Sequence, residues 1–152
     1  MQTFSKTRTP LAALVWGWAG VIPFVVMTFV LVLADEIWKP KIELVLPLYS
    51  AVILTFMGGV HWGIAMVKIH TSLWLYSTGI IPSIFAIISI LLPSYYAVLV
   101  LISGFIILLA TDIYLVSFEA LPSWYGNLRI YLTLAVLICL TSAFFHLDSI
   151  RF

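Results

Sequence analysis

The feature that most constrains the fold is a series of five apolar runs, each close to the ~20 residues that a helix needs to cross a bilayer. Hydrophobic residues make up 64% of the chain, charged residues 9%, and the mean hydropathy is +1.20, which excludes a soluble globular domain. The runs also lack the polar–apolar alternation of membrane strands. We therefore predict an all-α polytopic membrane protein, a five-helix bundle that forms one transmembrane domain over residues 1–152. The predicted spans are about 11–34, 44–67, 72–92, 95–118 and 127–145.

The charges and the first ten residues bear on localisation. The first apolar run is too long for the apolar core of a signal peptide, and ten preceding residues are too few for a transit peptide, so we expect an uncleaved first span in a bacterial inner (plasma) membrane. Five spans place the two termini on opposite sides. The cations on the two sides number four and three, which favours a cytoplasmic N-terminus: Lys6, Arg8, Lys68 and Arg129 against Lys39, Lys41 and Arg151. A net charge of +1 gives no basic patch, so nucleic acid is not an expected partner.

Two prolines lie near the middle of predicted spans. Pro23 is in the first span and Pro82 is in the third. Each removes a backbone donor and frees the carbonyl four residues earlier, at Ala19 and Thr78. In lipid such carbonyls need partners from neighbouring helices, hydroxyl groups or water. We therefore predict proline kinks in the first and third helices.

Two ionisable residues lie at the same depth in the second and fourth spans. His61 precedes Lys68 by seven residues, and Asp112 precedes Glu119 by seven. At ~1.5 Å per residue each lies roughly 10 Å inside the same face, because the two spans run in the same direction. The freed carbonyl of Thr78 falls in about the same layer. These residues form the candidate intramembrane polar site.

An ionisable group at this depth normally has a partner inside the protein, and His61 and Asp112 are suited to partner one another. One interpretation is a buried polar latch between the second and fourth helices. Another is a functional pair, a proton relay or a quinone-binding dyad, in which the carboxylate fixes the imidazole tautomer. A third is that each residue has a separate partner.

Small residues recur every four positions along the second span, at Ala51, Thr55, Gly59 and Gly63. Such a ridge lets another backbone approach closely, and in lipid this packing is a principal source of helix association. His61 lies about 200° around the helix from the two glycines. The second helix therefore has two protein-facing sides and is predicted to be central. We expect the ridge to pack within the chain rather than in a homodimer.

Four segments together resemble the transmembrane protein 69-like family, a bacterial and mitochondrial group of unknown function. They are "YSAVILTFMGGVHWG" at 49–63, "IPS" at 81–83, Asp112 late in its span, and "LPSWYGNLRIYLT" at 121–133. The resemblance covers nearly the whole chain and implies a small polytopic inner-membrane protein. It supplies no activity. Its recurring residues, which have no assigned roles, correspond to His61, Trp62, Pro82, Asp112 and Arg129; Trp62 thereby joins the candidate polar site.

Three functional hypotheses follow. The first is an accessory or assembly component of a larger membrane complex, such as a respiratory complex, with other membrane subunits or further copies of itself as partners. The second is an oligomeric, proton-linked transporter of small solutes that uses the layer of His61 and Asp112. The third is a redox protein that binds quinone or haem at the same residues. No metal-ligand pattern, nucleophile motif or phosphate-binding loop is present in the sequence, so an enzyme is not favoured, and the cofactor is left open.

Overall fold

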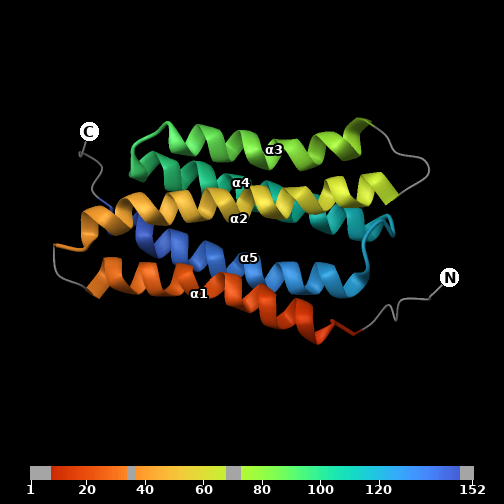
Figure 1. Ribbon diagram of the computed structural model, residues 1–152, viewed down its shortest axis with the longest axis horizontal. Coiled ribbons are helices and arrows are strands. Elements are labelled where there is room, and N and C mark those ends of the chain that lie inside the picture. Colours follow the sequence, from red (N-terminus) through yellow and green to blue (C-terminus); the bar gives the residue numbers. More distant parts are fainter. Residues whose placement is uncertain (1–7, 34–36, 68–72, 148–152) are drawn as a thin grey trace.

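The computed structural model describes residues 8–33, 37–67 and 73–147, and within these ranges it contains five helices and no strand. All five helices are long and apolar enough to cross a membrane, which confirms the predicted all-α polytopic bundle. Residues 34 and 72, at predicted span ends, lie outside the described ranges. The helices are α1 (Leu11–Leu33), α2 (Lys39–Val67), α3 (Leu73–Ile90), α4 (Ser94–Ser117) and α5 (Ser123–Phe144) (Figure 1).

Two helices begin a full turn or more before the start that the apolar runs indicate. Helix α2 begins at Lys39, five residues before its predicted start, and α5 begins at Ser123, four residues before. In both cases a proline lies at the start, Pro40 in the first turn of α2 and Pro122 at the N-cap of α5. Proline is favourable there because the first helical N–H groups have no intrahelical acceptor. The helices therefore extend beyond their apolar stretches.

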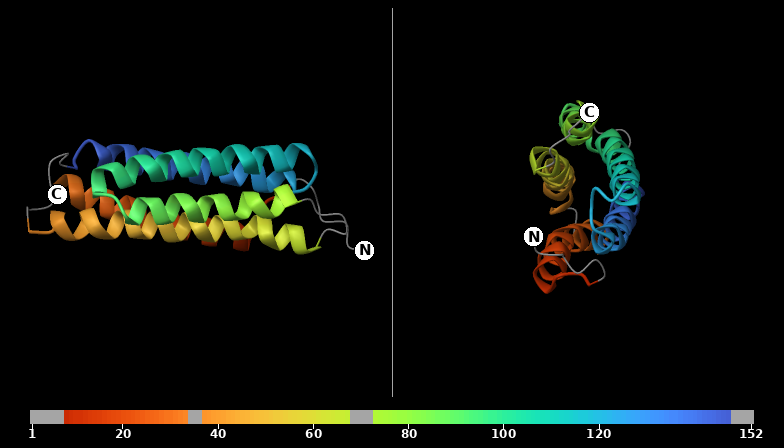
Figure 2. Two further views of the ribbon diagram at one scale, coloured as in Figure 1. Left: turned by 90° about the horizontal axis from the view of Figure 1, so that it is seen from above. Right: turned by 90° about the vertical axis from the view of Figure 1, so that its right-hand side faces the viewer.

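The five helices close into a ring. Helix α1 packs against α2 and α5, α3 packs against α2 and α4, and α4 packs against α5. Helix α2 also packs directly against α4, across the ring. The end-on view in the right panel of Figure 2 shows this arrangement, with α1 and α2 separated on one side. The central position predicted for the second helix is therefore shared by α2 and α4, each of which has three neighbouring helices.

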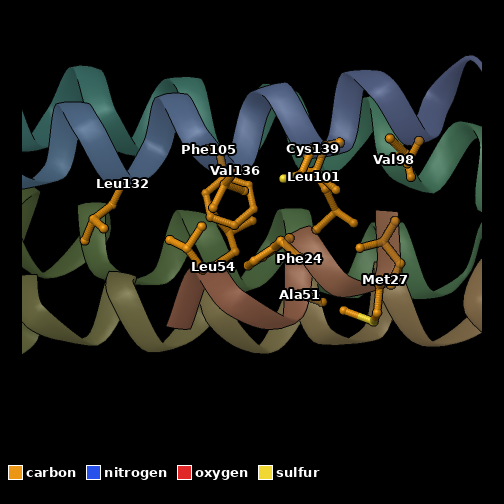
Figure 3. Close-up of a cluster of buried hydrophobic side chains, with 14 of the residues drawn as sticks. Phe24, Met27, Ala51, Leu54, Val98, Leu101, Phe105, Leu132, Val136 and Cys139 are labelled. Carbon is orange, nitrogen blue, oxygen red and sulfur yellow. The ribbon is translucent and has the colours of Figure 1, made fainter. Parts of the chain in front are cut away.

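Two apolar clusters fill the bundle. The larger one joins side chains from all five helices, and Phe24 of α1 lies edge-on to Phe105 of α4 at a ring-centroid distance of 6.3 Å. Figure 3 shows this cluster. The smaller one lies near the end of the bundle where α2 ends, and it consists of Ala65, Leu75, Leu115 and Leu121. The layer between the two clusters contains buried polar side chains.

The two prolines that are expected to kink their helices lie within continuous helices, Pro23 in α1 and Pro82 in α3, and α2 contains a third interior proline, Pro47. Beside the first of them, the Tyr49 hydroxyl of α2 donates to the carbonyl oxygen of Gly20 at 2.9 Å. Gly20 follows Ala19, whose carbonyl Pro23 leaves without its helical donor. A side chain from a neighbouring helix thus supports the backbone near this proline, as lipid surroundings require. The kinks themselves stay a prediction.

Candidate functional site

The polar layer is built by three helices that present ionisable side chains at the same depth. His61 lies six residues before the end of α2, and Asp112 lies five residues before the end of α4. Arg129 lies six residues after the start of α5, which is joined to α4 by a short turn. Because α4 and α5 are antiparallel, this spacing brings Asp112 and Arg129 level with one another. Three chain segments thus converge on one point inside the membrane-spanning bundle.

Asp112 is the centre of this polar network. Its Oδ1 lies 2.9 Å from Nε2 of His61, and its Oδ2 accepts from Nε of Arg129 at 2.7 Å. An ionised carboxylate only accepts, so Nε2 of His61 carries the hydrogen in this pair. All three residues are buried, with Asp112 and His61 0% exposed and Arg129 4%. The sequence-predicted pair is therefore in contact, and Arg129 joins it.

The hydrogen-bonding capacity of this network is only partly used. Nη1 of Arg129 donates to the Met57 thioether sulfur at 2.6 Å, and a thioether is a weak acceptor. Nη2 of Arg129 has no hydrogen-bond partner within the described chain, nor has Nδ1 of His61. Two hydroxyl groups on the same face of α5, those of Tyr125 and Thr133, are buried without partners as well. Buried unsatisfied polar atoms are rare in native proteins, and several of them here lie within about two turns of α5.

A cavity of about 640 Å³ lies beside Arg129, between α1, α2 and α5. We name it the α1 cleft. Arg129, Tyr125 and Thr133 all belong to its wall, whereas His61 and Asp112 do not. In Figure 1, α1 and α2 are close together where α1 ends and diverge toward the start of α1. The cleft lies along this divergent half, with residues 13–24 of α1 on one wall.

Two other predicted members of the polar site lie apart from the network. The hydroxyl of Thr78 is buried, but it donates its proton to the carbonyl of Leu75 in its own helix at 2.8 Å. Trp62 is 42% exposed and faces α3, where its ring lies 5.1 Å from that of Tyr76. A Cβ added to Gly79 of α3 would be placed against Trp62 as well. Trp62 therefore packs in the α2–α3 interface.

The small-residue ridge of α2 lies partly on the outer surface. Ala51 is buried, Thr55 and Gly63 are half-buried, and Gly59 is exposed. A Cβ added at Gly59 or Gly63 would meet nothing within 4 Å in the described chain. The expectation that this ridge packs within the chain is therefore wrong at both glycines. The glycine in close helix contact is Gly58, one residue away and about 100° around the helix.

Arg129 is the network residue that sequence reasoning missed. The sequence counts it among the surface cations, because it lies only two residues inside the fifth span predicted to begin at Asn127. The proline in "LPSWYGNLR" was the available signal, because a helix that starts at Pro122 carries Arg129 well inside the bundle. Arg129 is buried in an ion pair and is not a loop cation. Three cations then remain on each side, and three of these six, Lys6, Lys68 and Arg151, lie outside the described residues.

The network can hold a polar group but offers few metal ligands. Over residues 8–33, 37–67 and 73–147, no three His, Cys, Asp or Glu side chains gather. Asp112 is also engaged by Arg129, which offsets its charge. The available chemistry is hydrogen-bond donation, because Nη2 of Arg129 and the hydroxyl groups of Thr133 and Tyr125 have no partner in the described chain and all three residues line the α1 cleft.

Comparisons with known proteins agree with this architecture. The family described as "Protein of unknown function (DUF3429)" matches residues 9–145. "Transmembrane protein 69" of Xenopus tropicalis is 31% identical over 139 residues, which are 88% of this chain and 54% of that protein. The chain thus spans about half the length of this curated relative. No solved structure gives a significant match. The resemblance to the transmembrane protein 69-like family is confirmed.

Proposed function

The chain belongs to the DUF3429 family, and from this premise we propose that it is an accessory or assembly component of a larger membrane complex in a bacterial inner membrane. The observation that carries the proposal is the outward segment of the α2 ridge, formed by Thr55, Gly59 and Gly63. We name it the open ridge. Glycine inside a helix is less favourable than alanine by about 1 kcal/mol. At Gly59, which is exposed, and at Gly63, which is half-buried, an added Cβ would contact nothing in the described chain, so packing within the chain does not explain these two glycines. Close packing against a helix of another membrane protein would explain them, because small residues let two backbones approach closely.

Packing around the polar network supports this role over proton-linked transport. The smaller apolar cluster covers the network toward the nearer membrane face, with Ala65 and Leu115 about one turn beyond His61 and Asp112. On the other side Leu108 belongs to the larger cluster. A pair enclosed in this way, with both carboxylate oxygens occupied, is suited to fastening α2, α4 and α5 together. The orientation of the chain in the membrane stays open. Without Arg129, three cations remain on each side of the membrane, so the charges no longer favour a cytoplasmic N-terminus.

The test is the native size of the particle that contains the chain. Tagged protein is extracted from its own membranes in mild detergent, and the mass and composition of the particle are measured. We expect a fixed stoichiometry with a larger membrane partner. The substitution Gly59→Leu should reduce the recovered partner at least fivefold, because the side chain occupies the surface where a helix would approach.

A matched substitution at Gly20 makes this test specific. An added Cβ at Gly20 also meets nothing within 4 Å, but Gly20 lies on α1. Gly20→Leu should therefore leave the recovered partner unchanged. Recovery of the wild-type chain only as a monomer or homo-oligomer would refute the accessory role.

A further inference from the structure

The wall of the α1 cleft carries hydrogen-bond donors that lack acceptors. Arg129 is 4% exposed with Nη2 unpartnered, and Thr133 is 1% exposed with its hydroxyl unpartnered. Among the described residues, every other buried serine or threonine donates to a backbone carbonyl: Thr28, Ser50, Thr78 and Ser89. Thr133 is thus the exception, and it lies one helical turn from Arg129. Leaving such donors buried costs free energy, which a ligand with an accepting oxygen would recover.

The charge of the network indicates that this ligand is uncharged. Arg129 forms an ion pair with Asp112, so the positive charge at the cleft wall is already balanced. A carboxylate or phosphate group in the cleft would add an uncompensated negative charge in an apolar, membrane-embedded environment, which is costly. A carbonyl oxygen accepts the same hydrogen bonds without that cost.

The remaining walls favour a flat ring. Phe24 and Phe105 belong both to the cleft wall and to the core cluster in Figure 3, and Trp16, Phe56 and Trp124 complete an aromatic lining. Aromatic side chains pack well on planar conjugated groups. The cavity of about 640 Å³ is of a size typical for small-molecule sites. Trp16 is 76% exposed and Phe56 is 68% exposed, so the rim of the cleft lies on the lipid-facing surface.

From these observations we infer that the α1 cleft binds a lipid-soluble quinone. A quinone combines a flat ring, uncharged carbonyl acceptors and an apolar tail. One carbonyl accepts from Arg129 and Thr133, the ring lies among the aromatic side chains, and the tail leaves the cleft between α1 and α2 into the lipid. The site does not depend on the proposed accessory role, because the open ridge consists of different residues.

The test uses the purified full-length chain without partner proteins. It is incubated in dodecyl maltoside with a benzoquinone that carries a decyl tail, and retained ligand is counted by native mass spectrometry. We expect saturable binding of one quinone per chain. Gly20→Leu should weaken binding at least tenfold, because Gly20 lines the cleft and its added side chain enters open space. Gly59→Leu is the matched control, and it should change the affinity less than twofold.

Two further arms define the chemistry. Thr133→Val keeps the shape of the side chain and removes the hydroxyl, and it should weaken quinone binding about threefold to tenfold. Ethyl laurate supplies an uncharged ester with an apolar tail and no ring, and it should bind at least tenfold more weakly than the quinone. Equal binding of the ester would overturn the quinone assignment in favour of an ester lipid. Equal quinone binding by the Gly20→Leu and Gly59→Leu variants would overturn the cleft as the site. Because no partner is present, neither result depends on the accessory role.

Discussion

The two flanks of α2 are packed in opposite ways. Toward α3 the backbones are in close contact, and a Cβ added to Gly58 would lie 2.8 Å from the carbonyl oxygen of Gly79. Toward the first half of α1 the helices diverge, and a Cβ added to Gly20 would meet nothing within 4 Å. Helices gain little hydrophobic stabilisation from one another in lipid, so close approach is what holds the α2–α3 pair. The open flank instead leaves room for a ligand.

The polar network links the two flanks of α2 to the rest of the bundle. Its His61 comes from α2, its Asp112 from α4 and its Arg129 from α5, so it ties the tightly packed pair to the helix that forms the wall of the cleft. The difference between the flanks therefore separates a structural part of the molecule from a part suited to binding.

The largest effect is expected at the junction itself. Asp112→Ala removes the carboxylate and leaves the buried guanidinium of Arg129 unpaired, so we expect a loss of about 3–5 kcal/mol in the free energy of unfolding. Unfolding in mixed micelles of dodecyl maltoside and dodecyl sulfate measures this loss. Arg129→Met alone should have a similar effect, because it leaves the carboxylate buried without its cation.

The double variant distinguishes an ion pair from two independent contacts. With Asp112→Ala and Arg129→Met combined, no unpaired charge remains, and the total loss should be smaller than the sum of the single losses by at least about 1 kcal/mol. Strict additivity would show that the two residues act separately. The flanks would then not be joined through this network.

The next effect compares adjacent glycines on different sides of α2. Gly58→Ala forces the α2 and α3 backbones apart and should cost about 1–3 kcal/mol, the usual cost of overpacking. Gly59→Ala places the same methyl group in open space and should be neutral or stabilising by up to about 1 kcal/mol, because alanine is the better helix former. Thermal unfolding of both variants in detergent measures the difference. Equal stabilities would contradict the tight packing assigned to α2 and α3.

Much of the fold was predictable because membrane spans depend on a local property. Twenty apolar residues in a row leave few alternatives to a helix, and the five runs predicted the element type and order correctly. The depths of His61 and Asp112 were also predictable, since depth follows from counting residues along helices of known direction. Their 2.9 Å contact is consistent with that shared layer.

The rest of the site depended on how the helices are rotated, and sequence periodicity did not define this. Nearly every face of these helices is apolar, so neither Gly58 nor Gly59 is marked as the interface residue. The same ambiguity concealed the α1 cleft, which exists because two apolar helices diverge. Arg129 was missed for a different reason: it lies only two residues inside the predicted start of the fifth span and was counted as a surface cation, whereas the helix begins six residues before it, at Ser123.

The smallest effect compares two buried threonines. Thr28 of α1 donates to the carbonyl oxygen of Cys139 in α5 at 3.3 Å, whereas Thr133 in the wall of the cleft donates to nothing in the described chain. Thr28→Val should therefore destabilise the chain by about 0.6 kcal/mol, the average for a hydrogen bond between membrane helices. Thr133→Val should be neutral or stabilising, because it replaces an unsatisfied hydroxyl group by a methyl group of similar size. Unfolding in mixed micelles without ligand measures both changes, and equal losses would show that Thr133 has an acceptor within the folded chain.

The same measurement with saturating decyl benzoquinone sharpens the comparison of the two threonines. With the ligand bound, Thr133→Val should become destabilising relative to wild type, while the effect of Thr28→Val should stay the same. The reason is that only the hydroxyl in the cleft gains an acceptor from the ligand.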